Sequence, residues 1–152
     1  MDNIDLRILT LLQANASLTV ADIGKRVGLT AAPCWKRIQK LEETGVIRGR
    51  VALLDPKKLN VGLTVFVTMK TNRHDDNWLK DFATAVKEMP EVIEFHRLAG
   101  DIDYLLRVVV PDMEAYDEFY KGLIEKISLS DVTSSFSMEQ IKYTTALPLN
   151  QT

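Results

Sequence analysis

The stretch TVADIGKRVGLTAAPCWKRIQKL, residues 19–41, has the signals of two short helices joined by a tight turn. Thr19 and Asp22 have the spacing of a capping box, which stabilises the start of a helix, and Gly28 is a typical helix stop. Thr30 is a suitable N-cap for the helix that follows. Two helices with so short a glycine-containing connection predict a helix-turn-helix.

A further helix is predicted upstream of this stretch. Asp2 and Asp5 have the spacing at which an N-cap side chain and a first-turn carboxylate both stabilise a helix start. Apolar residues then recur at the spacing of one helical face over about residues 3–13. Three short helices complete the layout of a helix-turn-helix DNA-binding domain, which we place at residues 1–50.

Charge is distributed unevenly along the 152 residues. The net charge is −2, but residues 1–50 hold eight lysines and arginines against five acidic residues, whereas the remainder holds 11 against 16. A basic first part joined to an acidic second part predicts that only the first part binds a polyanion such as DNA.

The composition excludes several classes of protein. With 46% hydrophobic and 26% charged residues the chain is typical of a globular protein, and no apolar run approaches the roughly 20 residues that cross a bilayer. We see no signal peptide, and Cys34, the single cysteine, fits a reducing compartment. We therefore expect a cytoplasmic protein with no membrane partner.

The region after the third helix is expected to connect two domains. Val46-Ile47 and Val51 to Leu54 read as a strand or wing that ends at Asp55-Pro56. A polar hinge follows, so that residues 51–62 are predicted to be the wing and the linker.

Residues 63–152 alternate between the apolar periods of strands and helices. Pro90, the Gly100-Asp101 turn and Asp112 separate the segments. The predicted order is strand 63–69, helix 78–89, strand 92–98, strand 104–110, a helix after Asp112 that reaches Ile127, and a long strand 132–143. This βαββαβ order predicts an α+β, ferredoxin-like domain with four antiparallel strands and both helices on one face. The other face of the sheet, apolar over much of 105–110, is expected to pair with a second copy.

The outward face of the third helix has the residue types that contact DNA. Small side chains allow close approach to base edges, and lysine or glutamine bonds to bases or phosphates, although a solvated charged face would look similar. Arg37 could clamp a phosphate or pair with Glu42 or Glu43, and Trp35 could touch a thymine methyl group or pack on the next domain. The candidate DNA-binding residues are Thr30, Ala31, Ala32, Trp35, Lys36, Arg37, Gln39 and Lys40.

Asp101 and Asp103 stand two residues apart at the mouth of a predicted hairpin. Such a pair can perform acid–base chemistry, bind a metal or accept an ammonium group, and it can equally be one turn-forming residue beside a solvated one. His74 and His96 are isolated, and nucleophile elbows, phosphate-binding glycine loops and zinc spacings are absent from the sequence. We therefore predict no metal, no catalytic residues, no cofactor and no enzyme activity.

The order of short motifs along the chain resembles the Lrp/AsnC family of feast/famine regulators. The matching motifs are Asp2-Asn3-Ile4-Asp5 with Ile8-Leu9, Val27-Gly28-Leu29-Thr30 through Pro33-Cys34, Arg37-Ile38 with Leu41-Glu42 and Gly45-Val46-Ile47, Gly100-Asp101-Ile102-Asp103-Tyr104-Leu105-Leu106, and Val110-Pro111-Asp112-Met113. Each fragment is short, but their order and spacing cover nearly the whole chain.

This resemblance implies a winged helix-turn-helix followed by a ligand-sensing RAM domain of the dimeric α+β barrel type. It also implies homodimers that assemble into rings such as octamers, with an amino acid or related metabolite bound between dimers near the Gly100-Asp101 turn. The effector-binding residues it suggests are Leu98, Gly100, Asp101, Ile102, Asp103, Tyr104, Thr133, Ser134 and Ser135.

Two functions remain as hypotheses at this point. The first is a regulator that binds specific double-stranded DNA and responds to a small-molecule effector. The second is a metabolite-binding protein or enzyme built on the dimeric ferredoxin-like domain, in which the N-terminal helices serve only assembly.

Overall fold

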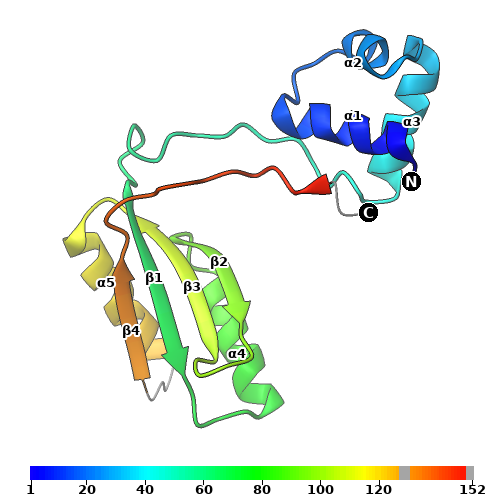
Figure 1. Cartoon of the computed structure of the whole chain (residues 1–152). Helices are drawn as coiled ribbons and strands as arrows, with labels where there is room; N and C mark the ends of the chain where they lie inside the picture. The colour runs from blue at the N-terminus through cyan, green and yellow to red at the C-terminus, as the bar shows by residue number, and fades with distance from the viewer. Residues whose placement is uncertain (127–130, 150–152) are drawn as a thin grey trace. The chain divides into compact units, whose positions relative to one another are not determined.

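The computed structural model describes residues 1–126 and 131–149 and divides into two compact units (Figure 1). One unit is Met1–Leu53 together with the segment that starts at Ile141, and the other is Leu54–Gln140. The prediction assigned everything from residue 63 onward to the second domain. The segment after Ile141 instead joins the first unit, where the side-chain amide of Gln13 bonds to both backbone groups of Leu147, at 2.9 and 3.0 Å.

The first unit has the three predicted helices, α1 (Asn3–Ala14), α2 (Val20–Val27) and α3 (Ala31–Glu43). Asp2 and Asp5 form a complete capping box at the start of α1, as their spacing predicted. The helices bury a small core of aliphatic side chains and one cysteine: Ile8, Leu12, Ile23, Val27, Cys34, Ile38 and Leu41.

The strand predicted over Val51 to Leu54 is not formed. Residues 46–62 contain no strand, and Val51, Leu53 and Leu54 are 66–81% exposed. The composition of this apolar run favours a strand, but a strand needs a neighbour for its backbone hydrogen bonds, and no other segment of the described chain pairs with this one.

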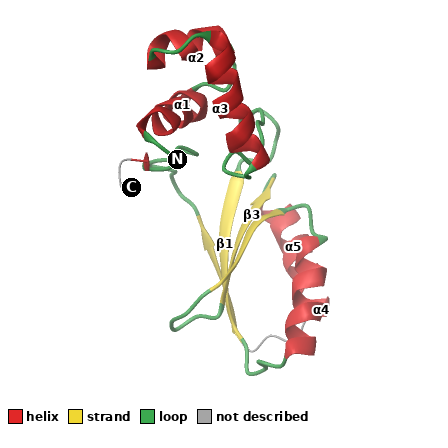
Figure 2. Ribbon diagram, turned by 90° about the vertical axis from the view of Figure 1, so that its right-hand side faces the viewer, coloured by secondary structure: helices red, strands yellow, loops and turns green. Residues whose placement is uncertain are grey.

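The second unit has the predicted βαββαβ order. Its elements are β1 (Leu63–Lys70), α4 (Asp76–Lys87), β2 (Val92–Arg97), β3 (Tyr104–Val110), α5 (Met113–Lys126) and β4 (Asp131–Phe136). The strands form one antiparallel sheet in the order β2-β3-β1-β4. Both helices cover the same face of this sheet (Figure 2), so the ferredoxin-like α+β prediction is confirmed. Ile127, the predicted end of α5, lies outside the described residues.

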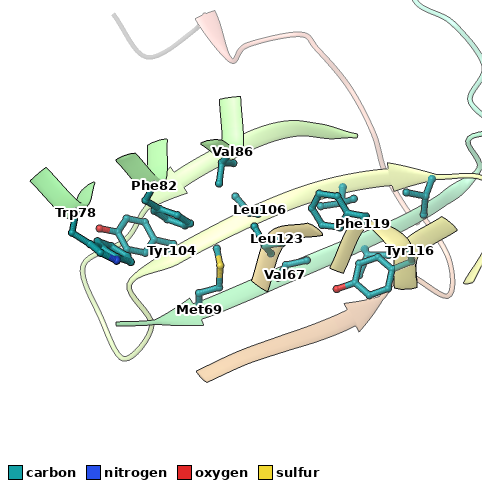
Figure 3. Packing of buried hydrophobic residues seen from close by; sticks show 13 residues of the cluster. Val67, Met69, Trp78, Phe82, Val86, Tyr104, Leu106, Tyr116, Phe119 and Leu123 are labelled. Carbon is teal, nitrogen blue, oxygen red and sulfur yellow. The ribbon is translucent and has the colours of Figure 1, made fainter. Parts of the chain in front are cut away.

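The core of the second unit lies between the sheet and the two helices (Figure 3). Along β3 the burial alternates, so Tyr104, Leu106, Val108 and Val110 face the helices. Leu105, Arg107 and Val109 project from the opposite face, which we call the open face. On the open face of β3, Arg107 is therefore the one charged residue between the apolar Leu105 and Val109.

The last strand is shorter than predicted, because it ends at Phe136 rather than Tyr143. Its neighbour β1 starts at Leu63, and the bond from the Ser137 N–H to the Thr64 carbonyl, at 2.9 Å, is the last between the two segments. Beyond it Met138 is 97% exposed. In the part of the chain that the structure describes, no helix is long and apolar enough to cross a membrane.

Candidate functional site

The turn between α2 and α3 brings two backbone segments into close contact. Gly28 adopts the left-handed conformation with φ 79°, and the Leu29 N–H donates to the Gly24 carbonyl at 2.8 Å. A β-carbon at Gly24 would lie 2.7 Å from the Leu29 oxygen, so only glycine fits there. Gly24 is not among the residues predicted from the sequence, although a glycine inside a predicted helix is a signal of such a close contact.

One face of α3 is buried and the other is exposed. Cys34, Ile38 and Leu41 are buried, and burial raises the pKa of the Cys34 thiol, so this cysteine is a packing residue. Most of the predicted DNA-contact residues lie outside: Thr30, Ala31, Ala32, Trp35, Lys36 and Lys40 are exposed, and Arg37 and Gln39 are partly buried. Ala32, Trp35, Lys36 and Gln39 have the spacing of a single helical stripe.

Thr30 occupies the N-cap position of α3, but its hydroxyl makes no capping bond. Thr19, at the equivalent position of α2, accepts a bond from the Asp22 N–H at 3.1 Å. The exposed Thr30 hydroxyl is therefore not used by its own helix.

Arg37 is held by the start of α1. Its Nη1 lies 2.8 Å from Asp2 Oδ2 and 2.9 Å from Asp5 Oδ1. The backbone N–H of Asp5 and the Arg37 guanidinium together lower the pKa of Asp2 to about 2. This arrangement ties α3 to the capping box of α1.

Of the two predicted alternatives for Arg37, the pairing with Glu42 or Glu43 is wrong, because Arg37 pairs with Asp2 and Asp5 while Glu42 pairs with Arg50 at 3.0 Å. A contact between Arg37 and a DNA phosphate stays a prediction. The Arg37 side of α3 faces α1, and this proximity cannot be read from residues that lie more than 30 positions apart in the sequence.

Asp103 is part of the framework of the β2–β3 hairpin. Its carboxylate Oδ2 accepts a bond from the Thr71 N–H at 2.9 Å, and its backbone bonds to Leu98 and Met69 at 2.8 and 2.9 Å. Asp103 is half-buried, whereas Asp101 is exposed. The two carboxylates therefore differ, because Asp103 fastens the hairpin to the end of β1 and Asp101 faces solvent.

Around these carboxylates, Gly100 is exposed, and Leu98 and Ile102 are partly buried. Tyr104, also a candidate effector residue, is 4% exposed. Its ring centroid lies 5.0 Å from that of Phe82 and 6.1 Å from that of Trp78 (Figure 3). The ring of Phe95 also lies close, at 5.8 Å. In this structure Tyr104 is a core residue.

The three candidate hydroxyl residues of β4 lie on two different faces. Ser134 faces the helices and forms a hydrogen bond with the buried Tyr116 hydroxyl, whereas Thr133 and Ser135 are exposed on the open face. We expected β4 to lie beside the Gly100-Asp101 turn. It pairs instead with β1, which separates it from β3, because the ferredoxin-like order places the first strand in the middle of the sheet.

The open face has a polar and aromatic row that crosses all four strands. Glu94 pairs with Arg107, Arg107 with Phe66, and Phe66 with Ser135 in the strand register. Arg107 Nη1 lies 2.9 Å from Glu94 Oε2, and this bond, together with His96, lowers the pKa of Glu94. Phe66 remains 38% exposed between these polar neighbours.

A cavity of about 370 Å³ lies at the other end of β3 from the Gly100-Asp101 turn. Val110, Phe119 and Gly122 contribute to its apolar lining, and Glu91 and Lys126 contribute to its polar lining. None of the predicted effector residues lines it. Among the described side chains, no group of three His, Cys, Asp or Glu residues could hold a metal ion.

Comparisons with known proteins cover both units. A family model described as a winged helix-turn-helix DNA-binding domain matches residues 1–48, and one described as the Lrp/AsnC ligand binding domain matches residues 64–147. The chain is 54% identical over 150 residues to the DNA-binding transcriptional activator DecR of Escherichia coli (strain K12), covering 98% of this chain and 99% of that protein.

Two solved structures match nearly the whole chain. An AsnC family transcriptional regulator from Agrobacterium tumefaciens is 61% identical with a TM-score of 0.95, covering 98% of this chain and 97% of that one. The transcriptional regulator NMB0573 of Neisseria meningitidis, solved as a complex with L-Met, is 38% identical with a TM-score of 0.94, covering 99% and 97%.

Proposed function

The chain belongs to the Lrp/AsnC family of transcriptional regulators, and we propose that α3 binds specific double-stranded DNA while the second unit senses an amino acid or related metabolite. The observation that carries this proposal is the exposed stripe of α3, which combines small, cationic and amide side chains on a helix with a fixed position. Close approach and hydrogen bonding to bases and phosphates require that combination.

The residues of α3 have different parts in this proposal. Lys36, Lys40 and the free Thr30 hydroxyl bind phosphates, and Gln39 bonds to a base edge. Ala31 and Ala32 keep the first turn narrow enough to enter the major groove. Arg37 sets the position of α3 through Asp2 and Asp5.

A gel-shift assay tests the DNA-binding part. The DNA lies upstream of the protein's own gene, and unlabelled duplex of unrelated sequence competes. We expect retardation that resists the competitor and that Lys36→Ala with Lys40→Ala abolishes. The control is Lys80→Ala with Lys87→Ala, two exposed lysines of α4, which should bind as the wild type does. Equal binding by both double variants would contradict the proposed interface.

For the effector, we propose a site at the Gly100-Asp101-Ile102-Asp103 turn, flanked by Leu98. Asp101 and the second oxygen of Asp103 supply negative charge for an α-ammonium group, since Thr71 already occupies Oδ2. The L-Met complex of NMB0573 supports an amino acid as the ligand class. Of the β4 residues, Thr133 and Ser135 have hydroxyls free to reach a ligand on the open face, whereas Ser134 bonds to Tyr116.

Calorimetric titration with a panel of amino acids, beginning with methionine, tests this site. Asp101→Asn and Gly100→Val should lower the affinity for the amino acid, whereas Glu125→Gln, an exposed change on α5, should leave it unchanged. Binding that all three variants retain would place the effector elsewhere.

We also propose that the open face pairs with a second copy and that dimers assemble further, with an octamer as the expected ring. The exposed Phe66 and Ile93 favour such pairing, because large apolar side chains on a sheet face are typically covered. Light scattering should give a multiple of the mass of one chain. Phe66→Asp should lower that mass and Thr84→Asp, on the helix side, should not. A single-chain mass for the wild type would contradict the pairing.

A further inference from the structure

Trp35 is the only aromatic residue among the first 65 residues of the chain, and the first unit does not use it for its core. The buried cluster of α1, α2 and α3 is aliphatic, whereas the Trp35 side chain is 51% exposed. Its large apolar surface is therefore available to a partner.

The neighbours of Trp35 indicate which partner this is. Ala32, Lys36 and Gln39 share its stripe, so one face offers an apolar ring beside a cation and an amide. The major groove of DNA presents the matching set, since thymine offers a methyl group next to hydrogen-bond acceptors. Because alanine has little bulk, Ala32 leaves room for that surface to approach the bases.

The orientation of α3 places Trp35 away from α1. Residues two positions apart in a helix point about 200° apart, so Trp35 and Arg37 lie on nearly opposite sides of α3. Arg37 contacts Asp2 and Asp5 at the start of α1. Trp35 therefore projects from the side of α3 that α1 leaves open.

We propose that Trp35 contacts the 5-methyl group of a thymine in the major groove and makes this regulator prefer thymine at that position. The proposal rests on the proposed function, in which α3 enters the groove. It adds a specificity determinant, because lysine–phosphate contacts bind any sequence.

A comparison of thymine with deoxyuridine tests this contact, because the two bases differ only by the methyl group. The probe is a labelled duplex selected from a random pool by the full-length wild type, with its thymines replaced one at a time by deoxyuridine. Burial of one methyl group changes affinity roughly four-fold, so the wild type should lose about that factor when the contacted thymine is replaced. Trp35→Ala should bind the selected duplex more weakly and should not distinguish the two bases there.

Two controls separate this contact from other causes. Lys36→Ala should reduce the slope of log affinity against log salt by about 1 and keep the preference for thymine. Circular dichroism checks that Trp35→Ala remains folded, and Trp35→Phe, which keeps an aromatic ring, should retain part of the preference.

The possible outcomes are distinguishable. A wild type that binds no duplex in a salt-dependent way would overturn the proposed function and this inference together. Specific binding with equal affinity for thymine and deoxyuridine at every position would overturn the role of Trp35 alone. The role of Trp35 would also be overturned if Trp35→Ala kept the wild-type preference for thymine over deoxyuridine.

Discussion

The two units of the chain are stabilised by different means. The second unit has a core in which aromatic rings pack against one another, with Trp78 and Phe82 5.1 Å apart and Phe82 and Tyr104 5.0 Å apart. Among the described residues of the first unit, the buried core consists of aliphatic side chains and one cysteine, and Trp35 lies outside it. The first unit also has helix caps, a close backbone contact at Gly24 and the ion pairs that join Arg37 of α3 to Asp2 and Asp5.

The largest expected effect concerns the aromatic core of the second unit. Phe82→Ala removes a side chain that is 1% exposed, which should lower the free energy of unfolding by roughly 3–5 kcal/mol because a cavity remains. Thr84→Ala, an exposed change in the same helix, is the control. Urea unfolding followed by tryptophan fluorescence measures both, and a loss under ~1 kcal/mol for Phe82→Ala would contradict the assigned core.

The next effect concerns the turn of the first unit. Gly24→Ala places a β-carbon 2.7 Å from the Leu29 oxygen, so the backbone between α2 and α3 must shift. We expect a loss of roughly 1–3 kcal/mol, as for other overpacked sites, together with weaker DNA binding. Gly49→Ala is the matched control, since no atom lies within 4 Å of its added carbon. Thermal melting by circular dichroism should separate the two variants, and equal melting temperatures would contradict the close contact.

A smaller effect is expected at the bond between Tyr116 and Ser134. Tyr116→Phe removes the buried hydroxyl but keeps the ring, so it should cost about 1 kcal/mol. Urea unfolding measures this loss, and calorimetry should show unchanged effector binding. Weaker effector binding with unchanged stability would mean that Ser134 belongs to the ligand site, as the family resemblance implies.

The smallest expected effect is the loss of stability of the first unit at acidic pH. The folded pKa of Asp2 lies at about 2, below its ordinary value of 3.8, so its contribution to stability is present above pH 3.8 and is lost as the pH falls toward 2. Melting temperatures between pH 2 and pH 5 should therefore fall less steeply for Asp2→Asn than for the wild type. Glu43→Gln, which removes an exposed carboxylate from α3, should follow the wild-type curve, and identical curves for all three proteins would contradict the Asp2–Arg37 contact.

Local patterns were sufficient to predict most of the fold. Caps such as Asp2, Thr19 and Asp112 and the period of the apolar residues depend only on near neighbours, and the corresponding helices and strands formed as expected. The predictions were wrong for segments whose structure depends on a neighbouring strand. Residues 51–54 have strand-like composition but no neighbouring strand, and the last strand ends where β1 no longer accompanies it.

In the candidate site, too, local patterns were sufficient for some residues and not for others. The exposed residues of α3 could be predicted from the helical period, because the apolar residues of a helix mark its buried face and the remaining residues lie on the opposite face. Contacts between distant residues could not be read in this way: Arg37 with Asp2, Asp103 with Thr71, and Ser134 with Tyr116 all depend on how the elements pack. Tyr104 follows the Gly100-Asp101 turn in the sequence, which favours a place in the effector site, although its ring belongs to the core.

A regulator of the proposed kind must bind DNA differently when its effector is bound, and the affinity for DNA with and without effector tests this most directly. Fluorescence anisotropy would measure binding to the selected duplex at fixed salt, first alone and then with each amino acid that calorimetry shows to bind. We predict a change of roughly 5-fold or more, a typical size for coupling between sites, and its loss in Asp101→Asn. An unchanged DNA affinity at a saturating concentration of every bound amino acid would contradict the account.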